Sequence, residues 1–260
     1  MERLRAADPR RWLVAFDFDG TLSEIVPRPE EAVLDPALAP ALERIASLVG
    51  YLAVISARDR ATLARRLPPG WLTLGSYGLE LPELISASGY PEGFDPVVAR
   101  DSLDAVAHDL GALVSRWPQA RLERKTWGIA VHFRGGAEAD YADPGTYAEI
   151  EKLAQGHGCR AVAGRLVIEV EPQGKVDKGW AVRHLADVLS PSAVVFTGDD
   201  RGDVPAWRAT RELGATMPAV AVGIMSDEMP ASDLEVCDVV LGGRGEMPRL
   251  LGALLEIAEG

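Results

Sequence analysis

The sequence predicts an α/β fold in which a doubly wound, parallel-sheet core is interrupted by an inserted α+β domain. In the first and last thirds of the 260-residue chain, short apolar runs alternate with helical patterns, as in parallel strands joined by helices. In residues 94–172, strands instead follow one another closely, which indicates antiparallel pairing. We therefore expect a discontinuous core of residues 1–93 and 173–260 around an inserted domain of residues 94–172.

The N-terminal part begins with two continuous apolar runs, WLVAF and YLAVI, that suit buried parallel strands. Between them, Asp35-Pro36 is typical of an N-cap followed by the first helical position, and apolar residues continue at helical spacing to Val49. A second helix ends at Pro68-Pro69-Gly70. The predicted strands are 12–16, 51–55 and 72–74, with helices from Asp35 to Val49 and over 59–67.

The C-terminal part repeats this alternation. Its apolar runs predict strands over 193–196, 219–222 and 236–241, and its periodic segments predict helices over 178–189, 205–213 and 247–258. The middle part predicts helices over 95–117 and 144–157, each followed by a strand pair: 121–125 with 128–134, turning at Thr126-Trp127, and 159–163 with 166–171, turning at Gly164-Arg165. These two helix-hairpin blocks predict a small domain with its own sheet.

Composition excludes several functional classes. A net charge of -12 argues against nucleic acid as a partner, since phosphate-backbone binding needs a positive surface. No apolar run is long enough to span a membrane, and no apolar segment follows the charged N-terminus as in a signal peptide. Cys159 and Cys237 lie far apart without metal-type spacing, which favours a reducing, cytoplasmic location. The oligomeric state cannot be read from the sequence.

The strongest chemical signal is Asp17-Phe18-Asp19-Gly20-Thr21-Leu22, directly after the first strand. Ligands of open α/β sheets bind at the carboxyl ends of the strands. Alternation along the chain directs Asp17 and Asp19 the same way, while Gly20 permits a sharp turn. Such crowded carboxylates favour a hard cation such as Mg²⁺, although a solvated turn is the simpler alternative.

A second acidic cluster, Thr197 to Asp203 (TGDDRGD), follows the strand at 193–196 in the same way, with Asp199 at the strand end and Asp200 next to it. Two such clusters at one sheet edge can share a cation. We therefore favour a shared cation site over the alternative that the two clusters are unrelated polar loops.

Ser56, with Arg58 nearby, follows another strand, and Lys178 lies at a predicted helix N-terminus, where ammonium, amide groups and helix dipole favour a phosphate. Each alone could be a helix cap or a surface side chain.

In this order, the four segments resemble the signature motifs of the haloacid dehalogenase superfamily, mostly magnesium-dependent phosphatases with a Rossmann-like core and an inserted cap. The resemblance implies that Asp17 is the nucleophile, that Asp19 is the general acid and base, and that Ser56 and Lys178 hold the phosphoryl group. It also implies Asp17, Asp19 and Asp199 as Mg²⁺ ligands, supported by Asp200 and Asp203, with Gly20, Thr21 and Arg58 binding substrate.

Three segments further resemble the trehalose-6-phosphate phosphatases: LERKTWGIAVHFR, RLVIEVEPQGKVDKGWAV and GDDRGDVPAW. That resemblance implies hydrolysis of a small sugar phosphate, with the cap residues Glu123, Lys125 and Glu169 on the sugar hydroxyls. For Glu123 and Lys125 an ordinary exposed strand face competes with this role. For His132 and Arg134, substrate contact and structural support stay equally open.

The sequence departs from the family pattern at three places. Ala57 replaces the glycine of Ser-Gly-Arg, Tyr77 replaces the histidine of Gly-x-His-Gly, and Val204-Pro205 stands where an acidic pair is usual. The alternatives are a capped phosphatase for sucrose phosphate, mannosyl phosphoglycerate or another glycosyl phosphate, and a non-catalytic sugar-phosphate-binding regulatory module. A phospho-acceptor signalling domain would have no need of the inserted domain.

Overall fold

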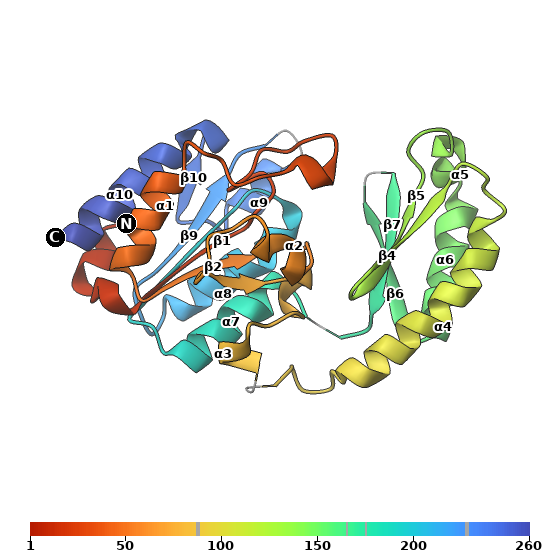
Figure 1. The fold of residues 1–260 in the computed structure, drawn as a ribbon, viewed down its shortest axis with the longest axis horizontal. Helices are drawn as coiled ribbons and strands as arrows, with labels where there is room; N and C mark the ends of the chain where they lie inside the picture. The colour runs from red at the N-terminus through yellow and green to blue at the C-terminus, as the bar shows by residue number, and fades with distance from the viewer. Residues whose placement is uncertain (87–88, 165, 175, 227–228) are drawn as a thin grey trace. The chain divides into compact units, whose positions relative to one another are not determined.

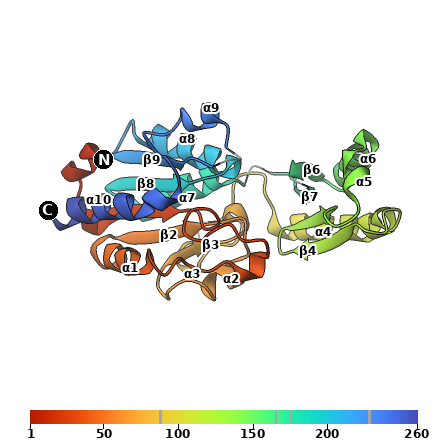
Figure 2. The ribbon, with the colours of Figure 1, turned by 90° about the horizontal axis from the view of Figure 1, so that it is seen from above.

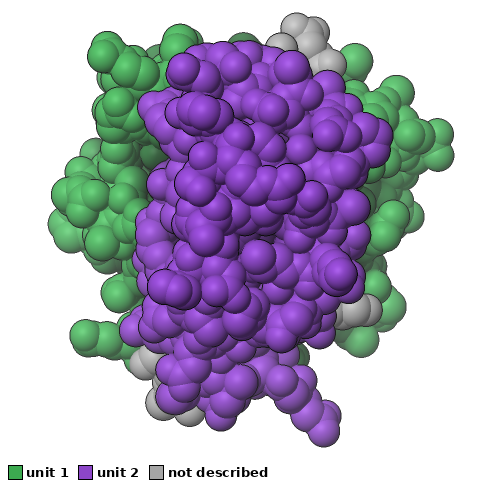
Figure 3. All heavy atoms as spheres, turned by 90° about the vertical axis from the view of Figure 1, so that its right-hand side faces the viewer, with its two compact units in different colours: residues 1–89, 176–260 green, residues 90–175 purple. Residues whose placement is uncertain are grey.

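The computed structural model describes residues 1–86, 89–164, 166–174, 176–226 and 229–260. The described chain divides into two compact units, residues 1–89 with 176–260 and residues 90–175 (Figure 3). The first unit is the α/β core and the second is the inserted α+β domain, here called the cap. Among the described residues, no helix combines the length and the apolarity needed to cross a bilayer.

The core is built on a six-stranded sheet in the order β10-β9-β8-β1-β2-β3, and each neighbouring pair is parallel. Figure 2 shows these strands side by side from β9 through β8 to β2 and β3. The strands are β1 (Trp12–Phe16), β2 (Tyr51–Ile55), β3 (Leu72–Leu74), β8 (Ala193–Gly198), β9 (Ala219–Ile224) and β10 (Val239–Leu241). The order changes direction at β1, whose neighbours are β2 and β8, so β1 lies at the switch point of the sheet.

Alternate residues of these strands enter two separate apolar layers. On β1, Trp12, Val14 and Phe16 pack on one face of the sheet and Leu13 and Ala15 on the other. The first layer also contains buried residues of α1 (Ala39–Leu48) and α10 (Met247–Glu259), which lie side by side in Figure 1. The second contains residues of α7 (Lys178–Leu189) and α8 (Val204–Leu213). Covering both faces leaves the strand ends as the free edge for a site.

Three shorter helices complete the core: α2 (Arg60–Ala64), α3 (Glu83–Ser86) and α9 (Ala231–Leu234). The cap has its own four-stranded antiparallel sheet in the order β4-β5-β7-β6. Its elements are α4 (Pro96–Val114), β4 (Arg121–Lys125), β5 (Gly128–His132), α5 (Glu138–Ala142), α6 (Pro144–Gly156), β6 (Cys159–Gly164) and β7 (Val167–Pro172). Arg165, part of the predicted second turn, lies outside the described residues.

The first helix begins later than the sequence predicts. Helix α1 starts at Ala39, and Asp35 does not cap it. The Asp35 carboxylate instead accepts the Ala37 N–H at 2.8 Å and pairs with Arg244 at 2.6 Å. These contacts hold residues 35–37 in a turn before the helix, so the capping prediction was wrong because a distant arginine competes for the same carboxylate.

The last strand is shorter than predicted, because β10 begins at Val239 rather than at Val236. The turn after helix α9 occupies this stretch, where the Cys237 N–H donates to Leu234 O at 2.9 Å. Asp238 accepts the Ala221 N–H with its side chain at 2.9 Å. In the cap, β5 ends at His132, so Arg134 lies in the turn beyond the strand. Helices α3, α5 and α9 were not predicted because they are only four or five residues long.

Candidate active site

The two acidic clusters meet because β1 and β8 are parallel neighbours in register. Phe16 pairs with Thr197, so the residues that follow both strands leave the sheet at the same edge. The Asp17 N–H donates to Thr197 O at 2.8 Å. Asp17 and Asp199 are each only 3% exposed. The predicted meeting of two strand-end carboxylates is therefore present in the structure.

Lys178 enters this group from α7. Asp177 caps the helix by accepting the Trp180 N–H at 2.7 Å, which makes Lys178 the first helical residue. Its ammonium group donates to Asp17 Oδ1 at 2.6 Å and to Asp203 Oδ1 at 2.7 Å, and the side chain is 2% exposed. A fully buried ammonium is stable here only because two carboxylates compensate its charge.

Asp203 has a more central place than the supporting one that the sequence suggested. Its second oxygen accepts the backbone N–H groups of Asp199 at 3.0 Å and Asp200 at 3.1 Å, so both carboxylate oxygens are occupied. Asp200 and Asp203 form a capping box at the short helical turn Arg201–Asp203. The three-residue spacing of these aspartates was the available signal for this role.

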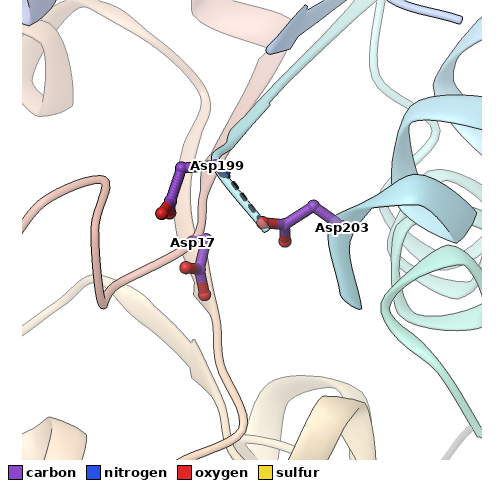
Figure 4. A group of neighbouring side chains, drawn as sticks. All are labelled: Asp17, Asp199 and Asp203. Atoms are coloured by element: carbon purple, nitrogen blue, oxygen red, sulfur yellow. Dashed lines mark hydrogen bonds between the residues drawn. The ribbon is translucent and has the colours of Figure 1, made fainter. Parts of the chain in front are cut away.

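Asp17, Asp199 and Asp203 form the one candidate metal group found among the described residues, with ligand atoms within 4.8 Å of one another. Figure 4 shows the three carboxyl groups converging, with Asp17 and Asp199 from the strand ends and Asp203 from the start of α8. No hydrogen bond among the described residues uses Oδ2 of Asp17 or Oδ2 of Asp199. The free oxygen of Asp199 is well placed to bind an ion, and the free oxygen of Asp17 is available to an ion or to a ligand.

Burial and like charge both disfavour ionised carboxylates at this site. Burial raises the pKa of Asp17 to about 7, although Lys178 lowers it, and Asp200 and Asp199 raise it further. Burial also raises the pKa of Asp199 to about 7, with Asp203 adding to the effect and the Thr21 hydrogen bond opposing it. One ammonium cannot balance three carboxylates, so the group fits a hard divalent cation with oxygen ligands, such as Mg²⁺.

Burial lowers the pKa of Lys178 when taken alone, but the charges of Asp17, Asp203 and Asp200 outweigh it and raise that pKa well above its usual value. The Lys178 side chain therefore stays an ammonium over the whole physiological range. It supplies a fixed positive charge beside Asp17 that does not depend on a bound ion.

Gly20 and Thr21, which the sequence predicts to bind substrate, support Asp199 in this structure. The Thr21 hydroxyl is fully buried and donates to Asp199 Oδ1 at 2.9 Å. Gly20 has φ +83°, and a Cβ added there would lie 1.9 Å from Asp199 Oδ2. No other residue could occupy this position without displacing the carboxylate.

The structure separates Asp19 from the candidate metal group. Its carboxylate accepts two hydrogen bonds from Arg58, at 2.6 Å from Nε and 2.7 Å from Nη2. The guanidinium also donates to Pro29 O at 2.7 Å and lies over the ring of Phe18. Fork-like pairing of this kind fixes both side chains. The sequence contained no indication that Arg58 would bind Asp19.

Ser56 is buried at the end of β2, where its hydroxyl oxygen accepts the Arg58 N–H at 3.2 Å. The hydroxyl proton can still be donated to a ligand oxygen. Asp200, unlike Asp199, is exposed. The core thus brings Asp17, Lys178, Asp199 and Asp203 into contact, with Ser56, Asp19 and Arg58 at the ends of β2 and β1.

Four of the cap residues singled out in the sequence lie on one face of its sheet. Glu123 pairs in register with Ala130, and Ala130 with Glu169, which places the two glutamates in one row across three strands. His132 Nε2 lies 2.7 Å from Glu123 Oε2, and Lys125 forms an ion pair with Glu169. The alternate residues, such as Ile129 and Val131, are buried on the opposite face.

Arg134 is not part of this cluster, because it lies in the turn beyond β5 and is exposed. In this turn the Gly135 N–H donates to Glu138 at 2.8 Å, which connects the turn to α5. The cap face therefore offers two carboxylates, a lysine and a histidine, which can accept from and donate to the hydroxyl groups of a ligand.

Comparison with known proteins points to one family. The model of the trehalose-phosphatase family matches residues 15–234. A trehalose-phosphate phosphatase of Mycobacterium tuberculosis is 35% identical over 205 residues, 76% of this chain and 51% of that protein. An uncharacterized glycosyl hydrolase of the same organism is 35% identical over 213 residues, 79% of this chain and 16% of that protein. This chain thus spans only part of each relative.

Among solved structures, the C-terminal domain of a Candida albicans trehalose-6-phosphate phosphatase aligns with a TM-score of 0.72 at 20% identity. The alignment covers 98% of this chain and 94% of that one. At this identity the likeness shows the fold, a core with an inserted cap, over nearly the whole chain.

Replacing Asp199 by Asn tests the candidate metal group. In chelator the variant should be more stable than the parent protein, because one buried charge is removed. Each gain of 1 kcal/mol in the free energy of unfolding would raise Tm by about 2–4 °C. Saturating Mg²⁺ should stabilise the parent by about 2.7 kcal/mol at a hundredfold excess over its Kd, and the variant much less. Calorimetry with and without Mg²⁺ measures both effects. Asp187→Asn, which removes an exposed carboxylate on α7, is the control, and an equal Mg²⁺ effect in Asp199→Asn and parent would reject the site.

Proposed function

The chain belongs to the trehalose-phosphatase family, and from this premise we propose that it is a Mg²⁺-dependent phosphatase that hydrolyses trehalose 6-phosphate through an aspartyl-phosphate on Asp17. The observation that carries the proposal is the buried contact of 2.6 Å between the Lys178 ammonium and Asp17 Oδ1. It leaves the second oxygen of Asp17 available as a nucleophile at the switch point of the sheet.

The reaction proceeds in two displacements. Asp17 Oδ2 attacks phosphorus, the bond from phosphorus to the sugar oxygen breaks, and the sugar oxygen takes a proton from the Asp19 carboxyl group. Water then attacks the acyl phosphate and gives one proton to Asp19. Inorganic phosphate leaves, and Asp17 is restored as a carboxylate. Protons and charge balance over the two steps.

Lys178 and Ser56 hold the transferring phosphoryl group by charge and by a hydroxyl hydrogen bond. Asp199, through its free oxygen, and the Asp17 carboxylate would hold Mg²⁺, and a bound ion would neutralise negative charge on the phosphoryl oxygens. In the described conformation Asp19 is bound by Arg58. The Asp19 carboxyl group must leave the guanidinium before it can transfer a proton.

The cap residues support a polyhydroxylated substrate. Glu123 and Glu169 can each accept from sugar hydroxyl groups, while Lys125 and His132 can donate or share a proton. Ala130 lies between the two glutamates in this row, and its small side chain is fully buried. These cap residues favour trehalose 6-phosphate over sucrose phosphate, mannosyl phosphoglycerate or another glycosyl phosphate.

A non-catalytic sugar-phosphate-binding module is the competing proposal from another class. Such a module needs neither a nucleophile nor an acid. The buried arrangement of Asp17, Lys178 and Asp199, together with the retention of Asp19, favours catalysis. We further propose that the enzyme is cytoplasmic and acts on a small molecule, without a membrane as a partner. Its net charge of -12 also argues against nucleic acid as a partner.

Phosphate release from a panel of sugar phosphates tests the activity. We expect release from trehalose 6-phosphate that exceeds that from sucrose phosphate and glucose 6-phosphate, and loss of activity in chelator. Asp17→Asn should lower kcat by about 10⁴-fold or more, because the carboxylate nucleophile is absent. A preference for another sugar would refute the substrate assignment, and full activity of Asp17→Asn would refute the mechanism.

The role of the cap face is tested with Lys125→Met and Glu169→Gln. We expect kcat/KM for trehalose 6-phosphate to fall by about 10²-fold, since each change leaves sugar hydroxyl groups without a charged partner. Turnover of p-nitrophenyl phosphate, which has no sugar, should change little. Arg124→Met is the matched control, because Arg124 is the next residue on β4 but binds Asp104 and Leu103 O instead. Equal losses on both substrates would assign the two residues a structural role.

A further inference from the structure

The turn after β3 holds two successive non-glycine residues in the left-handed backbone region. Ser76 has φ +49° and Tyr77 has φ +60°, between Gly75 and Gly78. A Cβ makes this conformation costly, and residues stay in it only where their surroundings impose it. Four such residues occur in the described chain, and only these two are adjacent.

Contacts with the Ser56 segment impose this conformation. The Ser76 N–H donates to Arg58 O at 2.8 Å, and the Tyr77 N–H donates to Ser56 O at 2.9 Å. The Ser76 hydroxyl donates to Glu80 at 2.7 Å, and the other oxygen of Glu80 accepts the Arg60 N–H at 2.9 Å. The turn is thus bonded along the whole segment that carries the proposed phosphate-binding serine.

The same turn also borders the other two parts of the site. A Cβ added at Gly78 would lie 2.8 Å from the Cβ of Ala181, so the turn packs directly against α7, the helix that begins with Lys178. A Cβ added at Gly202 would lie 3.7 Å from Cε1 of Tyr77. The tyrosine ring therefore lies beside the loop between Asp199 and Asp203.

We propose that Tyr77 is a positioning residue: its ring, held out by the strained turn, sets the distance between the Ser56 segment and the Asp199–Asp203 loop. The proposal rests on the proposed phosphatase function. Phosphoryl transfer depends on the placement of groups around phosphorus, and a small displacement of one loop lowers the rate strongly. A rigid ring suits such a spacer because only two side-chain torsions are ordered.

Three substitutions separate positioning from stability. Tyr77→Gly and Tyr77→Ala both remove the ring, but glycine adopts φ +60° without strain and alanine does not. We expect the glycine variant to unfold about 2–4 °C above the alanine variant. Both should lose kcat by about tenfold or more, because the loop spacing is lost in each. Tyr77→Phe retains the ring and should stay within about threefold of the parent.

A matched control checks the strain argument. Ser190 also has a left-handed backbone, with φ +47° after the last residue of α7. Ser190→Gly should raise Tm without changing kcat, since it relieves similar strain away from the proposed site. A loss of kcat in this variant would overturn the assignment of the effect to Tyr77.

Inhibitor binding supplies a readout that is independent of turnover. Orthovanadate resembles the transferring phosphoryl group, so a misplaced loop should weaken its binding by about tenfold, and that of orthophosphate much less. If kcat of the glycine variant rises above that of the alanine variant together with Tm, Tyr77 is only structural and the proposal fails. Wild-type kcat in Tyr77→Gly would also overturn it. If the parent protein hydrolyses no phosphomonoester, the proposed function fails. The positioning role is then still decided by whether the Tyr77 variants bind orthovanadate more weakly than the parent while their binding of orthophosphate changes less.

Discussion

The buried ammonium group of Lys178 is the interaction on which this site depends. It contacts Asp17 and Asp203, and all three side chains are almost fully removed from solvent. Removing one partner from a buried ion pair typically costs about 3–5 kcal/mol, because the remaining charge is left without compensation. The three residues come from the end of β1, from the start of α7 and from the turn before α8, so this contact joins the first and last parts of the core. It also leaves excess negative charge, which a bound cation would offset.

The backbone around this contact is shaped to let the charged groups approach. Gly20 allows Asp199 to lie where any side chain would clash. A Cβ added at Gly198 would lie 2.3 Å from Cγ of Asp203, so a second glycine admits the second carboxylate. Thr21 and the amides of Asp199 and Asp200 then orient these carboxylates. Gly20 and Thr21, which the sequence predicts to bind substrate, thus also support the Asp199 carboxylate.

The sequence predicted the architecture well because its signals were local and strong. Continuous apolar strands, alternating helices and close hairpin pairs gave the parallel core and the antiparallel cap sheet. It also placed Asp17 and Asp199 at one sheet edge, since strand ends follow from strand positions. The sequence could not show that Asp35 would pair with Arg244 and not cap its helix, or that Arg58 would bind Asp19. The partners of each pair are far apart in the chain. The left-handed backbone at Tyr77 could not be predicted either, because tyrosine does not favour that conformation.

The most direct test of the central claim is to locate a divalent ion in crystals of the protein grown with Mn²⁺ in place of Mg²⁺. Anomalous scattering identifies the ion independently of its surroundings. This account predicts one strong peak between the carboxylates of Asp17 and Asp199, with Lys178 still bound to Asp17 and Asp203. A site without Mn²⁺, or a peak bound only by residues elsewhere, would contradict it.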